Sequence, residues 1–130
     1  MPSVNGLLEA AVYVADLDRS VRFYEDVMGF RRMWGDQRGV AFAVAEKQVF
    51  LVFLKGGSTA HIPPHDGDGR LHAAFSIAAA ELNDWERHLA AKGVAVEHRT
   101  TWPKGGASLY FRDPDGHLLE VVTPGVWDVY

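Results

Sequence analysis

The chain repeats itself, and the repeat limits how it can fold. The segment LEAAVYVA beginning at Leu8 matches LHAAFSIA beginning at Leu71, and each is followed by a helical pattern that ends at a glycine. The later segments EKQVFLVFLKGG and DGHLLEVVTPG also match, which places Leu51 in line with Glu120. A repeated segment of about sixty residues marks one supersecondary unit used twice. We therefore expect two similar modules in tandem.

Each module is predicted to consist of a strand, a helix and three further strands. Alternating apolar residues predict the strands, and apolar positions at helical spacing predict the helices. In the first helix Asp18 is expected to be the N-cap and Gly29 the left-handed stop. The predicted strands are Leu7–Ala15, Phe30–Trp34, Gly39–Ala45, Gln48–Leu54, Leu71–Ala78, Val94–His98, Ser108–Arg112 and Leu118–Thr123.

The Gly- and Pro-rich stretch 57–69 indicates a connector between the modules. A length of 130 residues suits a single domain. Within that domain we expect a first module at about 6–56, a second at about 70–125 and a C-terminal tail at 126–130.

Three ionisable residues, Glu9, His72 and Glu120, stand within apolar runs that are predicted to form buried strands, and the first two occupy the same position of the repeat. Strand alternation puts each on the face that carries small and polar residues, so all three are expected to line one concave surface. Burying such groups is costly unless a partner or a metal compensates, which indicates a functional site. The alternatives are that Glu9 reaches solvent or an arginine from an edge strand, and that His72 is a core histidine with satisfied hydrogen bonds.

Composition excludes several classes of function. The formal net charge is −4 and the basic residues are scattered, so neither nucleic acid nor an anionic membrane is expected as a partner. The absence of cysteine excludes disulfides, thiolate metal sites and a cysteine nucleophile. The N-terminus lacks the basic start and long apolar core of a signal peptide or membrane span, so a cytoplasmic protein is expected.

The element order and two motifs together carry a family resemblance. The opening VADLDRSVRFYEDVMGF and the closing SLYFRDPDGHLLEVVTPG resemble the vicinal oxygen chelate superfamily, which includes glyoxalase I, fosfomycin resistance proteins, extradiol dioxygenases and bleomycin resistance proteins. The resemblance covers nearly the whole chain. It implies an α+β fold in which two tandem βαβββ modules form an open, incomplete barrel around a cleft.

The resemblance also implies a metal site. The family's three ligand positions fall on Glu9, where the family most often has His, and on His72 and Glu120. Glyoxalase I takes a fourth ligand from the position of Leu51, so this chain departs from that enzyme. Two carboxylates and one imidazole would hold one divalent ion, for which Mn²⁺, Fe²⁺, Zn²⁺ and Mg²⁺ are all suitable.

Further residues are expected around this site. Tyr110 matches the tyrosine that fosfomycin-type members use near the substrate, and Glu120 is expected to act in catalysis as well as in metal binding. The loop after Trp102 is a candidate lid. The expected substrate-binding residues are Tyr13, Trp34, Phe53, Trp102 and Lys104, although Trp34 and Phe53 would also suit a core. Three further histidines, His61, His65 and His117, are expected in loops and turns. Of these, His65 could fold over the cleft.

We interpret the chain as a metal-dependent enzyme that acts on a small oxygenated molecule by lyase, isomerase or addition chemistry. One alternative is an iron-dependent extradiol-type dioxygenase, which the Glu at position 9 disfavours. The other is a metal-free protein that sequesters a drug, as bleomycin resistance proteins do, and it would not need three ligands. A homodimer is also expected, because the resemblance implies one, because open sheets leave unpaired edges, and because Trp127 and Tyr130 beyond the last strand would be exposed in a monomer. The alternative is that the tail covers its own cleft.

Overall fold

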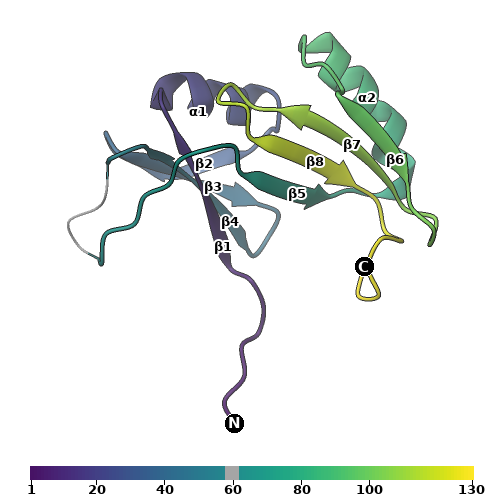
Figure 1. Cartoon of the computed structure of the whole chain (residues 1–130), viewed down its shortest axis with the longest axis horizontal. Helices are drawn as coiled ribbons and strands as arrows, with labels where there is room; N and C mark the ends of the chain where they lie inside the picture. The colour runs from purple at the N-terminus through teal and green to yellow at the C-terminus, as the bar shows by residue number, and fades with distance from the viewer. Residues whose placement is uncertain (58–61) are drawn as a thin grey trace. The chain divides into compact units, whose positions relative to one another are not determined.

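The computed structural model describes residues 1–57 and 62–130, so His61 lies outside the described residues. The chain divides into two compact units, Met1–Asp68 and Gly69–Tyr130. Each unit holds one four-stranded mixed sheet and one α-helix, and each sheet is open rather than closed into a barrel (Figure 1). The expected α+β fold of two tandem βαβββ modules is therefore confirmed.

The first module runs in the order strand, helix and three strands. Its sheet has the strand order β1-β4-β3-β2, with β1 parallel to β4 and the other neighbours antiparallel. The elements are β1 (Glu9–Val14), α1 (Leu17–Asp26), β2 (Arg31–Gly35), β3 (Gly39–Val44) and β4 (Gln48–Leu54).

The second module repeats this plan with one addition, the 3₁₀ turn η1. Its sheet has the order β5-β8-β7-β6, again with the first and last strands of the module parallel and adjacent. The elements are β5 (His72–Ser76), η1 (Ala79–Glu81), α2 (Leu82–Ala91), β6 (His98–Thr101), β7 (Ala107–Arg112) and β8 (Leu118–Val122).

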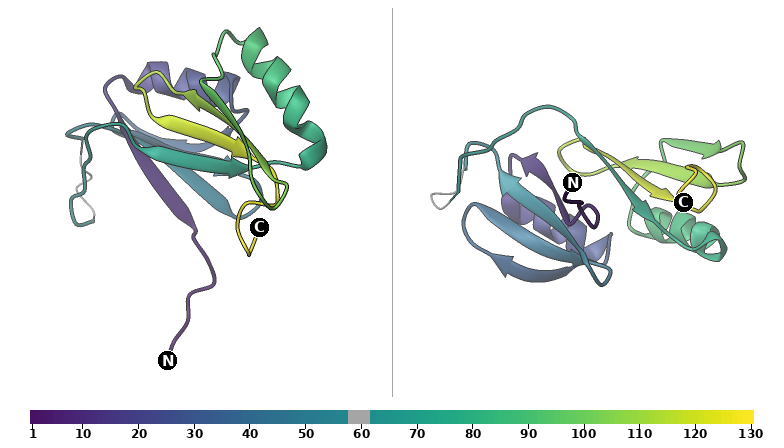
Figure 2. Two further views of the ribbon diagram at one scale, coloured as in Figure 1. Left: turned by 45° about the vertical axis from the view of Figure 1, so that its right-hand side comes forward. Right: turned by 90° about the horizontal axis from the view of Figure 1, so that it is seen from below.

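Each module has its core between its own sheet and helix (Figure 2). In the first module Tyr24 of α1 is fully buried and its ring lies 5.1 Å from that of Phe50 and 6.0 Å from that of Phe42. In the second, Leu89 of α2 and Phe111 of β7 are buried. Because strand side chains alternate between faces, the other face of each sheet carries the predicted site residues.

The sixth strand begins later than the sequence indicated. The prediction Val94–His98 is wrong, because β6 starts only at His98, which pairs with Tyr110 of β7. Among the preceding residues, the Val94 N–H donates to the Leu89 carbonyl at the end of α2, and the Glu97 N–H donates to the Tyr110 carbonyl. The apolar alternation of these residues resembles a strand, but β-pairing with β7 begins only at His98. The first strand likewise begins at Glu9 rather than at Leu7, and the remaining strand bounds agree with the prediction to within two residues.

The N-cap of α1 is Asp16 and not Asp18. The Asp16 carboxylate accepts a hydrogen bond from the backbone N–H of Arg19 at 3.0 Å, and Asp18 lies within the first helical turn. Both residues suit a cap chemically, and the end of β1 at Val14 selects the earlier one. At the other end Gly29 adopts a φ of 69°, as the predicted left-handed stop requires.

The C-terminal tail folds back onto its own module. The Tyr130 hydroxyl donates to the carbonyl oxygens of Ile77 and Val122, at 3.2 and 3.1 Å. Trp127 is 71% exposed.

No helix in the described part of the chain is long and apolar enough to cross a bilayer.

The cap assignment predicts unequal effects for two neighbouring aspartates. We expect Asp16→Ala to lower the free energy of unfolding by about 1 kcal/mol, because one N–H of the first turn loses its acceptor. Asp18→Ala should cost less, about 0.3–1 kcal/mol, because it removes only a charge near the helix N-terminus. Urea denaturation followed by circular dichroism measures both. An Asp18 variant as damaged as the Asp16 variant would contradict the assignment.

Candidate metal centre

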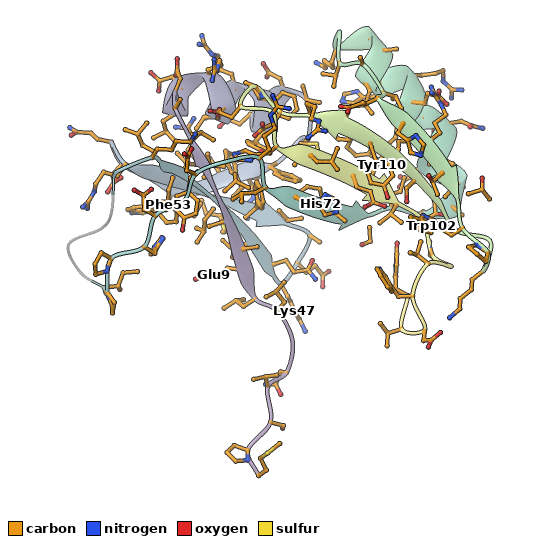
Figure 3. The ribbon with its side chains drawn as sticks, viewed as in Figure 1. Glu9, Lys47, Phe53, His72, Trp102 and Tyr110 are labelled. Carbon is orange, nitrogen blue, oxygen red and sulfur yellow. The ribbon has the colours of Figure 1, made fainter. Side chains whose placement is uncertain are left out.

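The polar residues of the second module gather on the face of its sheet that points away from α2. Tyr110 of β7 lies directly opposite Glu120 of β8, and Glu120 in turn lies opposite Ala74 of β5. Figure 3 shows His72 and Tyr110 on this sheet, with Trp102 at the end of β6. Residues from three strands and from the loop after β6, far apart in sequence, are therefore brought to one surface.

His72 and Glu120 form the centre of this surface. The Nε2 atom of His72 lies 3.4 Å from Oε2 of Glu120. The other ring nitrogen, Nδ1, is 2.9 Å from the carbonyl oxygen of Leu118 and must donate to it, since a carbonyl can only accept. The ring is thereby held with Nε2 directed at the carboxylate. A ligating histidine is commonly fixed in this way by a carbonyl on its second nitrogen.

The distance between these two atoms fits a shared metal ion. Ligands that each lie about 2.1 Å from a metal are about 3.0 Å apart in octahedral and about 3.4 Å apart in tetrahedral geometry. Two lone pairs that face each other repel unless a proton or a cation lies between them. The donor set of the second module therefore suits a divalent ion with open positions for further ligands.

Burial differs among the three predicted ligands. The side chain of Glu120 is only 9% exposed, whereas that of His72 is 50% exposed. Glu9 is exposed as well. The expectation that all three lie in buried strands is therefore wrong for Glu9 and His72. They stand on β1 and β5, the outermost strands of their sheets, while β8 has a neighbour on each side.

The structure brings together two of the three predicted ligands, His72 and Glu120. Among the described residues no three His, Asp or Glu side chains lie together as a metal cluster. Glu9 belongs to the first module, where it begins β1 opposite Val49. Its partnership with His72 and Glu120 stays a prediction.

Tyr110 is held as a neutral phenol beside this pair. Burial raises its pKa, and the negative charge of Glu120 and a hydrogen bond to that carboxylate raise it further, while a hydrogen bond with Ser108 acts in the opposite direction. The ring centroid lies 6.5 Å from that of His72 in a stacked arrangement. A protonated hydroxyl at this position can donate a hydrogen bond to a substrate oxygen.

Trp102 and Lys104 each contact a neighbouring part of the second module. The indole Nε1 of Trp102 donates to Ser108 Oγ at 2.7 Å, and Lys104 forms an ion pair with Asp128 of the tail. A Cβ added to Gly106 would lie 2.7 Å from the carbonyl carbon of Gly125, so the two backbones approach closely there, and the Gly106 N–H donates to the Gly125 carbonyl at 3.0 Å. The 102–106 loop is thus joined to the segment after β8 by hydrogen bonds and an ion pair, and its role as a lid stays a prediction.

The first module presents a different surface around Tyr13. The Tyr13 hydroxyl lies 2.6 Å from Nδ1 of His65, and Phe53 packs against both rings. His65 belongs to the connector, which is fastened by Asp66 through the backbone N–H groups of Gly56 and Gly67. The connector therefore folds over Tyr13, and Phe53 forms part of this cluster. In Figure 3 Glu9 and Phe53 lie toward opposite ends of the β1–β4 pair.

Leu51 is confirmed as the counterpart of Glu120. It lies opposite Ala11 in the parallel pair β1–β4, just as Glu120 lies opposite Ala74 in β5–β8. The first module thus offers an apolar side chain where the second offers a carboxylate. Trp34, on the outermost strand β2, is 53% exposed and stays a candidate contact only.

Sequence reasoning undervalued His117. It directly follows a turn, as expected, and precedes β8. Its side chain is buried, and its Nδ1 accepts a hydrogen bond from the backbone N–H of Leu71 at 2.9 Å. His98 and Ser108 also share the surface of Tyr110, as their strand register shows. The alternation of side chains along β6 and β7 could have predicted that His98 and Ser108 face the same way as Tyr110. The position of His98 was missed because the sequence placed it at the end of a strand, whereas β6 begins there.

Comparison with known proteins identifies the family. Residues 6–121 match the model of the Glyoxalase/Bleomycin resistance protein/Dioxygenase superfamily. The match covers most of the chain and both modules. The chain belongs to this superfamily, as the resemblance implied.

Individual proteins that the chain resembles include two transferases and a lyase. It is 33% identical to metallothiol transferase FosB of Bacillus licheniformis, over 88% of this chain and 73% of that protein. It is 31% identical to glutathione transferase FosA of Serratia marcescens, over 83% and 73% of the two chains. The crystal structure of lactoylglutathione lyase from Agrobacterium tumefaciens superposes with a TM-score of 0.91 at 31% identity, covering 98% of this chain and 99% of the other.

The cause of the raised Tyr110 pKa predicts how it responds to mutation. In Glu120→Gln the burial remains but the negative charge is gone, so the phenolate forms more readily and the Tyr110 pKa falls toward its ordinary value. Ultraviolet titration of tyrosinate measures the change, with Tyr110→Phe identifying the signal. An unchanged Tyr110 titration would show that Glu120 does not act on this phenol.

Proposed function

We propose that the protein is a divalent-metal-dependent enzyme that acts on a small oxygenated molecule by metal-assisted lyase, isomerase or addition chemistry. The single observation that carries the proposal is the pair formed by His72 Nε2 and Glu120 Oε2 at 3.4 Å. Glu9 is proposed as the third ligand, from the first module. The names of the relatives support metal-assisted chemistry but leave the reaction open.

Each residue of the proposed site would have a distinct role in metal or substrate binding. His72, Glu120 and Glu9 hold the ion, which when bound supplies a Lewis acid for substrate oxygens. The carbonyl of Leu118 keeps the His72 ring oriented. Tyr110 keeps its proton because of burial and the neighbouring carboxylate, and it donates a hydrogen bond to the substrate oxygen on which negative charge develops. Tyr13, Trp34, Phe53, Trp102 and Lys104 are proposed as further substrate contacts.

The identity of the metal is open among Mn²⁺, Fe²⁺, Zn²⁺ and Mg²⁺. One structural neighbour, a FosX variant from Listeria monocytogenes, was crystallised with Mn(II) and a dihydroxypropylphosphonic acid. That likeness, at 21% identity and a TM-score of 0.70, shows a common fold. The oxygen-rich set in this chain makes Mn²⁺ a good first choice for reconstitution.

The two alternatives are distinguished by the same residues. An extradiol-type dioxygenase is expected to use two histidines and one carboxylate for iron, and this chain has Glu9 at one histidine position. A metal-free drug-binding protein would have no need to direct His72 Nε2 at a buried carboxylate. The pair therefore favours the metal enzyme. The homodimer stays a prediction, for which the outermost strands β1, β2, β5 and β6 offer the edges.

Metal binding is the direct test of this proposal. We expect calorimetric titration of the metal-free protein with Mn²⁺ and Zn²⁺ to show one site per chain, and His72→Ala to abolish it because one of the two paired ligands is gone. Glu9→Gln should weaken binding less, since the pair in the second module remains. His88→Ala, which removes an imidazole from α2, serves as the matched control.

The outcomes separate the alternatives. Equal metal uptake by the wild type and His72→Ala would refute the ligand assignment. No uptake by the wild type would favour the metal-free binding protein. Loss in His72→Ala with an unaffected Glu9→Gln would confine the site to the second module.

Glyoxalase I activity is expected to be low or absent. Leu51 is apolar at the position where that enzyme places an acidic ligand, so no group stands there to move the substrate proton. The likeness to lactoylglutathione lyase makes this reaction the informative one to assay. The test is turnover of the glutathione–methylglyoxal hemithioacetal by the metal-loaded protein. Robust turnover that chelation abolishes would overturn this prediction.

A further inference from the structure

His117 is a buried histidine that the proposed chemistry does not use. It is 1% exposed and immediately precedes β8, the strand that carries Glu120. Its Nδ1 lies 2.9 Å from the backbone nitrogen of Leu71, which must be the donor. Nδ1 of His117 therefore carries a lone pair, and its role here is that of an acceptor.

The residue that His117 holds is the neighbour of His72. Leu71 is also bonded to Leu118, because the Leu118 N–H donates to the Leu71 carbonyl at 2.8 Å. The Leu118 carbonyl in turn accepts from His72 Nδ1 at 2.9 Å. Three hydrogen bonds thus interlock residues 71–72 with residues 117–118. They act at the start of β5, an outermost strand that has a neighbour only on the side of β8.

His117 is itself fixed by the turn before it. Its backbone N–H donates to the carboxylate of Asp113 at 2.9 Å, and the Asp113 N–H donates to the His117 carbonyl at 3.1 Å. The same carboxylate also accepts from the N–H of Asp115 at 3.0 Å. Asp113 is 5% exposed, so this support is largely removed from water.

We infer that His117 is a positioning residue for the proposed metal site. By accepting the Leu71 N–H it fixes the first residues of β5 against β8, so that the Leu118 carbonyl meets His72 Nδ1 and directs Nε2 at Glu120. This inference rests on the proposed function for the identity of the ligands. The interlock itself involves only the metal-free protein, so it can be tested separately.

Two substitutions of nearly equal shape test the role of the acceptor. Asn carries an amide oxygen near the position of histidine Nδ1, whereas Leu carries a methyl group there. We expect His117→Leu to weaken Mn²⁺ binding about tenfold or more, as changes to groups that orient metal ligands do, and His117→Asn to bind close to the wild-type level. His117→Gln, whose amide reaches toward the Nε2 position, should behave like His117→Leu and replaces it if that variant does not fold.

A spectroscopic measurement on the metal-free protein complements the titration. Nitrogen NMR of the imidazoles should show His72 with its proton on Nδ1 in the wild type and in His117→Asn, and a mixture of tautomers in His117→Leu. His88→Ala is the control for the general loss of an imidazole, and urea denaturation shows whether stability accounts for the effect.

The outcomes for the positioning role and for the proposed function are distinct. Equal metal affinity and equal His72 tautomers in His117→Leu, His117→Asn and the wild type would overturn the positioning role. Equal loss in the Asn and Leu variants would overturn it as well, by showing that the ring and not its acceptor matters. A wild type that takes up no metal would sink the proposed function, while the His72 tautomers would still decide the positioning role.

Discussion

The parallel pairing of the first strand of each module with its last is the constraint on which the rest depends. In the second module it sets β5 beside β8, although some forty residues separate them in the chain. The register, with Ala74 opposite Glu120, leaves His72 one strand over and two residues back, within reach of the carboxylate. Any shift by one residue would turn one of the two side chains to the core face. The helix and the antiparallel strands between them supply the core that holds this register.

The two modules share this frame but differ in the chemistry of their polar faces. Where the second has Tyr110 and Glu120 opposite each other, the first has Ala41 and Leu51. The first module instead places Tyr13 on this face and covers it with connector residues through His65. The two scaffolds are therefore equivalent in strand order and register, and they differ at a few facing positions. Glu9, at the repeat position of His72, is an ionisable residue of the first module.

The repeat and the strand alternation were enough to predict the βαβββ modules and the face that each site residue shares. They could not predict burial, because that depends on the position of a strand in its sheet. Glu9 and His72 lie in runs as apolar as that around Glu120, yet they stand on outermost strands and are exposed. The cap at Asp16 was missed for a related reason, since two aspartates fit the pattern and only the end of β1 decides between them. The role of His117 depends on a contact with Leu71 across the sheet, which no local pattern records.

The difference in burial between the two paired ligands has a chemical consequence. Glu120 is nearly withdrawn from water, so its charge is poorly solvated and attracts a cation or a proton donor more strongly than a surface carboxylate would. Tyr110 provides one such donor, and it alone would not balance a full charge. The side chain of His72 is half exposed. A buried carboxylate beside a solvent-accessible imidazole would suit the proposed metal centre, in which coordination positions stay open for exchange. Chemistry on a substrate would require such open positions, and closed structural metal sites lack them.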